Sequence, residues 1–157
     1  MKHKTCNKVM VFGTFDIFHR GHENFLKQAR EYGNFLIVVV ARDKTVLAVK
    51  GKLPRNSEKA RLQTIINNGL ANEIILGGLT DKYKIIKKHQ PDIICLGYDQ
   101  QPFTEKLEEK LKEYKLKTKI IRLKPYYPKK YKTSFLLSFP RKRESRSKIN
   151  KLQFLKK

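Results

Sequence analysis

Short apolar runs alternate with amphipathic segments along most of the chain, and the apolar runs predict strands. The run from Phe35 to Ala41 is continuous and rich in β-branched residues, which is typical of a strand covered on both faces of a sheet. The other runs are shorter but similar in kind. Together they predict five strands, at residues 8–12, 35–41, 73–76, 93–96 and 119–123.

Apolar residues at helical spacing mark the segments between these runs. In one such segment Leu62, Ile65 and Ile66 share a face, after a cap at Asn56 or Ser57. Since strands alternate with helices, the sheet should be parallel with right-handed crossovers. The pattern predicts a single α/β domain, Rossmann-like, with a five-stranded parallel sheet and helices on both faces. The predicted helices cover residues 21–32, 57–68, 81–88 and 105–114, and residues 49–55 are predicted to be a loop.

The turn between the first strand and the first helix carries the most specific chemistry. Gly13 would let a ligand approach the backbone, and the N–H groups that open the helix would favour an anion. His19 and His22 flank Gly21, which permits the sharp turn needed for two imidazoles to converge on one phosphate. Two loop histidines could be polar surface, but the complete pattern favours an active site.

This turn resembles the signature of the cytidylyltransferase-like nucleotidyltransferases. The residues that carry the resemblance are Gly-Thr-Phe-Asp at 13–16 and His-Arg-Gly-His at 19–22. The family includes glycerol-3-phosphate cytidylyltransferase, phosphopantetheine adenylyltransferase and archaeal-type FAD synthetase. The resemblance covers roughly residues 8–134. It implies transfer of AMP or CMP from ATP or CTP to a phosphorylated small-molecule acceptor, with release of pyrophosphate and with Mg²⁺ as the expected cofactor.

The resemblance also assigns roles within the turn. His19 and His22 would stabilise charge at the reacting phosphate, and Asp16 would orient the acceptor or the metal. No set of metal ligands is identified. The nucleotide site would be lined by Gly13, Thr14, Phe15 and Gly21.

Two basic positions further along the chain are candidates for phosphate or nucleotide contact. Lys50 and Lys52 flank Gly51 and could meet phosphate oxygens, or they could belong to a solvated loop. The resemblance favours a catalytic role and leaves open which lysine acts. Arg61 fits a family E-x-x-R pattern close to the bound nucleotide, although it could also be a solvated helix residue.

Polar residues follow the predicted strands at their carboxyl ends, where open α/β sheets bind ligands. Asp43 follows the second strand and is an acceptor-binding candidate, while Gly97 and Asp99 follow the fourth and are nucleotide-binding candidates. Thr133 and Ser134 partly match a family segment that binds nucleotide phosphates, although the leading isoleucine and a later arginine are missing.

The stretch Pro-Asp-Ile-Ile-Cys-Leu-Gly-Tyr-Asp-Gln, at 91–100, bears on the substrate. It resembles archaeal-type FAD synthetases more than the Gly-Asp-Asp-Trp of glycerol-3-phosphate cytidylyltransferases. FMN adenylylation and glycerol-3-phosphate cytidylylation are therefore the two leading expectations.

Composition adds a strong positive charge, formally +22 over 157 residues. This excess of positive charge reflects either a lysine-rich composition or a partner such as nucleic acid. The alternative hypothesis is therefore that the protein is a catalytically impaired family member that binds nucleic acid. Residues 1–137 are expected to form the enzyme domain, and 138–157 a basic tail that is disordered or atypical. By analogy a homodimer is possible.

The remaining features exclude several classes of protein. Cys6 and Cys95 lack the spacing of a disulfide framework or a zinc site. No apolar run is long enough to cross a bilayer, and the N-terminus lacks an apolar signal core. We therefore expect a cytoplasmic protein.

Overall fold

The computed structural model describes residues 7–81, 83–98, 100 and 106–125. Its strands are β1 (Lys8–Gly13), β2 (Phe35–Val40), β3 (Glu73–Leu76), β4 (Ile93–Leu96) and β5 (Lys119–Arg122). Its helices are α1 (Arg20–Arg30), α2 (Asp43–Lys50), α3 (Glu58–Asn68), α4 (Lys84–His89) and α5 (Leu107–Glu113).

The strands form one parallel sheet in the order β3-β2-β1-β4-β5, which confirms the predicted fold class. The central strand β1 pairs with β2 on one side and β4 on the other. The strand order therefore reverses direction between β1 and β4. Open α/β sheets bind ligands at such a switch point, beside the carboxyl ends of the two strands.

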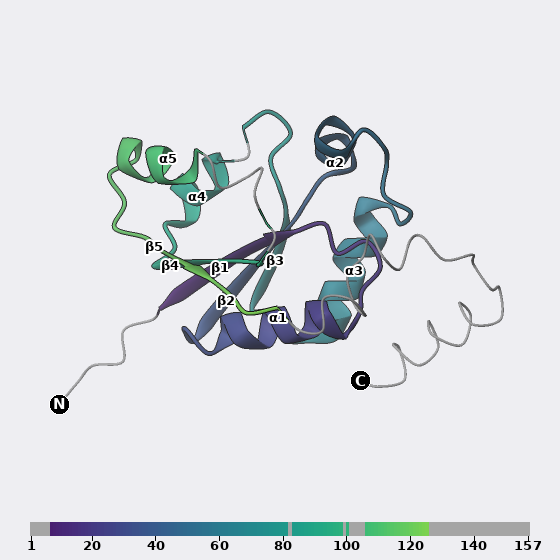
Figure 1. Cartoon of the computed structure of the whole chain (residues 1–157), viewed down its shortest axis with the longest axis horizontal. Coiled ribbons are helices and arrows are strands. Elements are labelled where there is room, and N and C mark those ends of the chain that lie inside the picture. The colour runs from purple at the N-terminus through teal and green to yellow at the C-terminus, as the bar shows by residue number, and fades with distance from the viewer. Residues whose placement is uncertain (1–6, 82, 99, 101–105, 126–157) are drawn as a thin grey trace.

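Helices cover both faces of the sheet (Figure 1), and each face has its own core. Successive β1 residues point to opposite faces, so Val9 and Val11 pack with Leu26 of α1, whereas Met10 packs with Ile86 of α4. Cys95 lies fully buried in the first core, and burial raises the pKa of its thiol to about 12. The Cys95 side chain packs in the core as a small apolar group, as expected.

Helix α2 is the main departure from the predicted elements. Its last two residues, Val49 and Lys50, lie in a segment predicted to be a loop, and that prediction is wrong for both. The helix buries only Val46, so it shows no apolar stripe by which a pattern could be recognised. It ends at Gly51, whose φ of 79° is left-handed and stops the helix.

Other differences are smaller. Ile66 is 45% exposed, so the predicted apolar face of α3 is narrower than expected. The helix predicted to start at Asp81 begins at Lys84 instead, because the Asp81 carboxylate accepts a hydrogen bond from the backbone of Tyr83 and forms a turn. Within the described ranges no helix has the length and apolar character needed to cross a membrane.

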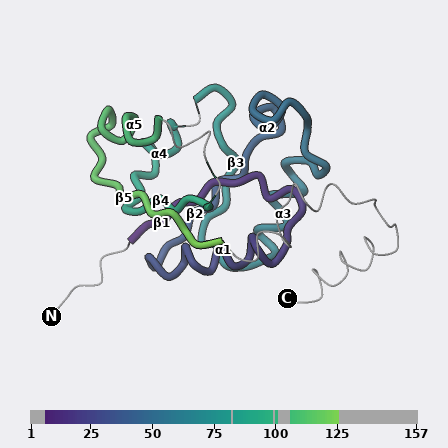
Figure 2. The backbone as a smooth tube through the Cα atoms, viewed as in Figure 1, coloured from purple at the N-terminus to yellow at the C-terminus, as the bar shows by residue number. Residues whose placement is uncertain are grey.

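Two connections meet beside α3. The loop after β1 lies next to the segment that joins α2 to α3, as the backbone tube shows (Figure 2). This meeting brings the glycine- and histidine-containing turn together with the basic segment around residues 50–56.

Candidate active site

The histidine pair forms the start of α1. His19 is the N-cap, and its Nδ1 accepts a hydrogen bond of 3.0 Å from the backbone N–H of Gly21. In return, the backbone N–H of His19 donates to Nδ1 of His22 at 3.3 Å. This is a reciprocal capping box in which two imidazoles replace the usual hydroxyl and carboxylate. The helix start thus fixes both rings.

These hydrogen bonds also assign the proton of each ring. Because both Nδ1 atoms accept, the neutral imidazoles carry their hydrogen on Nε2. The rings stack with their centroids 3.8 Å apart and their planes 23° from parallel. Two imidazolium ions could not stack this closely without strong repulsion.

The pKa values agree with a neutral pair. Burial lowers the pKa of His19 to about 4. Burial, followed by the charges of His19 and Lys50, lowers the pKa of His22 to about 3, against a smaller raising effect of the Ile17 carbonyl. At neutral pH both rings are therefore hydrogen-bond donors without net charge.

Phe15 supports His22 from the side. Its ring meets the imidazole edge-on, with centroids 5.3 Å apart and an interplanar angle of 74°. The backbone of Phe15 is left-handed, with φ of 53°, and a Cβ at Gly13 would lie 2.7 Å from the phenyl ring. Gly13 thus makes room for Phe15, a packing reason that the sequence did not predict. The expected nucleotide contacts of Gly13, Thr14, Phe15 and Gly21 remain predictions.

Asp16 joins the histidine turn to the basic segment. Its two carboxylate oxygens accept hydrogen bonds of 2.9 Å from the backbone N–H groups of Arg55 and Asn56. The Asn56 side chain donates back to the Asp16 carbonyl. Asp16 is buried and holds the two loops together, and its predicted role toward the acceptor remains a prediction.

Arg61 is the centre of a buried network. Its side chain has no exposed surface, so the alternative of a solvated helix residue is wrong. The guanidinium donates to the carbonyls of Thr14, Ala41 and Asn56 at 2.9, 2.8 and 3.0 Å. It also pairs with the Asp43 carboxylate at 2.7 Å. One side chain therefore fixes the ends of β1 and β2 and the starts of α2 and α3.

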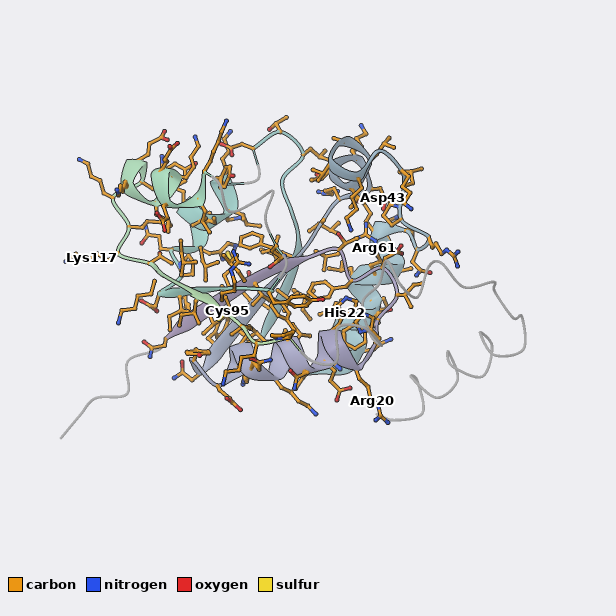
Figure 3. The ribbon with its side chains drawn as sticks, in the orientation of Figure 1. Arg20, His22, Asp43, Arg61, Cys95 and Lys117 are labelled. Atoms are coloured by element: carbon orange, nitrogen blue, oxygen red, sulfur yellow. The ribbon has the colours of Figure 1, made fainter. Side chains whose placement is uncertain are left out.

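Asp43 is shared between Arg61 and a second pair of charges. Its backbone N–H donates to Glu58, and its carboxylate accepts from the Glu58 backbone at 3.3 Å. Arg42 pairs with Glu58 at 2.9 Å. The backbone N–H of Asp43 and the Arg42 guanidinium lower the pKa of Glu58. Figure 3 shows Asp43, Arg61 and His22 in succession along the same side of the molecule. The predicted nucleotide contact of Arg61 and acceptor contact of Asp43 remain predictions.

The two candidate lysines differ in position. Lys50 is the last residue of α2, and its charge acts on His22 strongly enough to lower the imidazole pKa. Lys52 lies beyond the helix end and is exposed. The charge of Lys50 thus reaches His22, and the predicted catalytic roles of Lys50 and Lys52 remain predictions.

The carboxyl end of β4 is tied to that of β1 by Gln100. The side chain of Gln100 accepts from the Gly97 N–H at 2.7 Å and donates to the Phe12 carbonyl at 2.8 Å. Arg122 donates to the Gly97 carbonyl at 2.6 Å. Sequence reasoning did not identify Arg122 or Asn56 as residues that shape the site, because contacts across distant segments leave no local signal.

Some predicted residues lie outside the described part of the chain. These are Asp99, Thr133, Ser134 and the tail at 138–157. Among the residues that are described, no group of three or more His, Cys, Asp or Glu side chains could hold a metal ion. The carboxylates of Asp16 and Asp43 accept hydrogen bonds from the protein, and the predicted role of Asp16 toward a metal remains a prediction.

Known proteins resemble this chain over most of its length. Residues 10–148 match the sequence profile of the family described as cytidylyltransferase-like, a range that extends past residue 137. The chain is 42% identical to the FAD synthase of Aciduliprofundum boonei over 76% of this chain and 79% of that protein. It is 44% identical to the FAD synthase of Methanohalophilus mahii over 76% of this chain and 83% of that protein.

A solved structure has the same fold. The lipopolysaccharide core biosynthesis protein of Thermoplasma volcanium superposes with a TM-score of 0.72 at 38% identity, over 78% of this chain and 99% of that one. The signature at residues 13–22 lies within the profile match. The resemblance found in the sequence is confirmed: the chain belongs to the cytidylyltransferase-like family and is a nucleotidyltransferase.

Proposed function

We propose that this nucleotidyltransferase is an FAD synthase, which transfers AMP from ATP to the phosphate of FMN and releases pyrophosphate. The curated relatives with that name are 42% and 44% identical to this chain over about three quarters of its length. The observation in the structure that carries the proposal is the stacked, neutral histidine pair at a helix N-terminus, within the electrostatic reach of Lys50.

In the proposed reaction an oxygen of the FMN phosphate attacks the α-phosphorus of ATP. The bond from that phosphorus to the bridging oxygen of pyrophosphate breaks as the new P–O bond forms. Negative charge grows on the leaving oxygen and on the non-bridging oxygens, and catalysis therefore depends on positioned donors and cations. The imidazoles of His19 and His22 would donate to these oxygens, and Lys50 would supply a full positive charge.

Two other residues would act by positioning the catalytic side chains. Asp16 holds the basic segment against the histidine turn, and Arg61 holds the backbone at Thr14. Mg²⁺ would enter as the ATP complex and neutralise phosphate charge, since the described residues provide no cluster of metal ligands.

A pyrophosphate-release assay tests the proposal. The purified protein is incubated with Mg²⁺ and either ATP or CTP, together with FMN, glycerol 3-phosphate or phosphopantetheine. We expect release only with ATP and FMN, and chromatography should then detect FAD. Release with CTP and glycerol 3-phosphate instead would reassign the substrate. No release with any pair would refute the proposed function.

Two further properties follow as proposals. The enzyme would act in the cytoplasm, where ATP and FMN occur, and it would form a homodimer, as its relatives often do by analogy. Analytical ultracentrifugation checks the second point. The comparisons give no support to a nucleic-acid-binding function in place of catalysis.

A further inference from the structure

The pairing between β1 and β4 stops before β1 itself ends. Strand β1 pairs with β2 as far as Gly13, opposite Val40, but with β4 only as far as Val11, opposite Cys95. The strand order reverses between β1 and β4, and open α/β sheets bind ligands in the crevice beyond the carboxyl ends of such strands. The group that ends this pairing therefore shapes the crevice.

The side chain of Gln100 takes the place of the next bond in this ladder. Continued beyond Val11 and Cys95, a parallel ladder would pair the carbonyl of Phe12 with the N–H of Gly97. Instead, Nε2 of Gln100 donates to that carbonyl at 2.8 Å, and Oε1 accepts from that N–H at 2.7 Å. The amide satisfies both backbone groups, so β1 and β4 separate here without leaving either group unpaired.

The other three junctions of the sheet continue at their carboxyl ends. In each of them a backbone N–H that follows one strand donates to the last carbonyl of the neighbouring strand, at 2.8 or 2.9 Å. These bonds join Ala41 to Gly13, Gly77 to Val40, and Leu123 to Leu96. The break between β1 and β4 is therefore local to Gln100 and is not a general fraying of the sheet.

Gln100 is held in place from β5. Arg122 donates to the Gly97 carbonyl at 2.6 Å and to the Gln100 carbonyl at 3.3 Å. The backbone N–H of Gln100 donates to the same Gly97 carbonyl at 3.2 Å. A Cβ at Gly97 would lie 3.4 Å from Cγ of Gln100, so the Gln100 side chain lies against this glycine. Because the backbone around it is fixed, the amide is in position before a ligand arrives.

We infer that Gln100 is a positioning residue, whose amide holds β1 and β4 apart and so opens the crevice that receives the nucleotide. The inference rests on the proposed function and deepens it, since ATP is the proposed nucleotide. The Phe12 carbonyl lies one residue before Gly13, where the turn that carries His19 and His22 begins. The Gln100 side chain thus sets the spacing between the start of that turn and the end of β4.

Two substitutions at Gln100 separate the opening of the crevice from the stability of the fold. Gln100→Ala releases the Gly97 N–H and the Phe12 carbonyl, which can then pair directly and close the crevice. Gln100→Met keeps a side chain of similar length between the strands but leaves both backbone groups without partners. We therefore expect Gln100→Met to unfold at a lower urea concentration than Gln100→Ala and yet to bind ATP more tightly.

Isothermal titration calorimetry with ATP and Mg²⁺, in the absence of an acceptor, measures this affinity. The Kd should rise about tenfold or more in Gln100→Ala, and less than about threefold in Gln100→Met. Gln63→Ala is the matched control, because the Gln63 amide donates to Asn67 along the exposed side of α3 and lies outside the crevice. Its Kd should stay within about twofold of the wild-type value.

Nuclear magnetic resonance observes the bonding of the strands without ligand or catalysis. Scalar coupling passes through a hydrogen bond, so the amide nitrogen of Gly97 should couple to Cδ of Gln100 in the wild-type protein. In Gln100→Ala the same nitrogen should couple to the carbonyl carbon of Phe12. Circular dichroism of each variant checks that it is folded.

The outcomes separate this inference from the proposed function. The positioning role is overturned, and FAD synthesis stands, if FAD is formed and Gln100→Ala makes no direct bond or binds ATP with wild-type affinity. It is also overturned if the two variants lose affinity in the order in which they lose stability. If Gln100→Ala weakens ATP binding as expected but the wild-type protein forms no FAD, the positioning role stands and the proposed reaction fails.

Discussion

At the scale of single residues, the histidine pair combines two tasks that are usually separate. Each Nδ1 accepts a backbone hydrogen bond at the start of α1, and the same bond leaves the ring proton on Nε2. In most helices the N-cap is a residue such as serine or aspartate, whose side chain caps the helix and has no further role. Here each capping ring also keeps an N–H group, which can take part in chemistry.

Substitutions that keep the cap but remove the imidazole should separate these tasks. Asparagine is a good N-cap, and glutamine suits the third helical position of a capping box. His19→Asn and His22→Gln should therefore melt near the wild-type temperature while kcat falls about 10²–10³-fold. His22→Ala should lose a similar factor in kcat with the fold intact, and also about 1 kcal/mol in the free energy of unfolding.

Turnover and urea denaturation are measured on all three variants. Full activity in His22→Gln would remove that imidazole from the mechanism. Equal losses of stability in the Gln and Ala variants would show that the cap is not needed.

The lowered pKa values predict the response to pH. With the pKa of His19 near 4 and that of His22 near 3, both rings stay neutral from pH 8 to about pH 5. The two imidazoles should therefore contribute no step to the profile of kcat/KM at the ordinary histidine value of 6.5, and their contribution should fall only toward pH 4.

Stability should follow the same pKa values. The unfolded chain binds protons near 6.5 and the folded chain only near 4 and below, so the free energy of unfolding falls as pH drops through that window. NMR titration of the two imidazoles checks this directly. A ring that titrates near 6.5 in the folded protein would contradict the prediction.

At the scale of elements, Arg61 makes four segments depend on one side chain. The guanidinium donates in several directions at once, to carbonyls and to a carboxylate. A lysine would keep the charge but could not reproduce this planar set of hydrogen bonds. The buried carbonyl groups that follow β1 and β2 would then lose hydrogen-bond donors that now satisfy them.

Arg61→Lys should lower the free energy of unfolding by about 2 kcal/mol, since buried carbonyls are left without partners. It should also lower kcat, because the backbone at Thr14 leads into the histidine turn. Lys59→Ala is the control, an exposed substitution on the same helix that should stay within about 0.5 kcal/mol. Urea titrations of both variants give the comparison, and equal stabilities would contradict the assigned role.

The strands could be predicted because they are short apolar runs, and four of the helices because their apolar residues recur at helical spacing. Phe35–Val40 and the residues of α1 are examples. Helix α2 could not, since it buries a single residue and three of its exposed side chains, Leu47, Ala48 and Val49, are apolar. For the site, the signature at 13–22 identified the histidines. Nothing in it indicated that Arg61 is buried or that Asp16 binds the segment at 55–56, because both depend on tertiary contacts.

At the scale of the whole molecule, the charge of +22 opposes folding through mutual repulsion. Four ion pairs between Lys or Arg and a carboxylate are found among the described residues, and most are at the surface, where each contributes little. The anionic substrates are attracted by the same charge.

Salt should therefore stabilise this protein. Raising NaCl to about 0.5 M shortens the Debye length well below 10 Å and screens the repulsion, so the melting temperature should rise. The KM for ATP should rise as well, because steering of the anion weakens. Scanning calorimetry and initial rates measure the two effects. A fall in melting temperature would mean that attractive pairs dominate.

The capping box at the start of α1 has a consequence for heating. Helix ends fray more readily than helix centres, and the first turn of α1 contains both imidazoles. Activity should then disappear reversibly several degrees below the calorimetric transition, while the sheet is still intact. Hydrogen exchange at the amide of Gly21 should accelerate over the same interval. Inactivation that coincides with global unfolding would contradict this order of events.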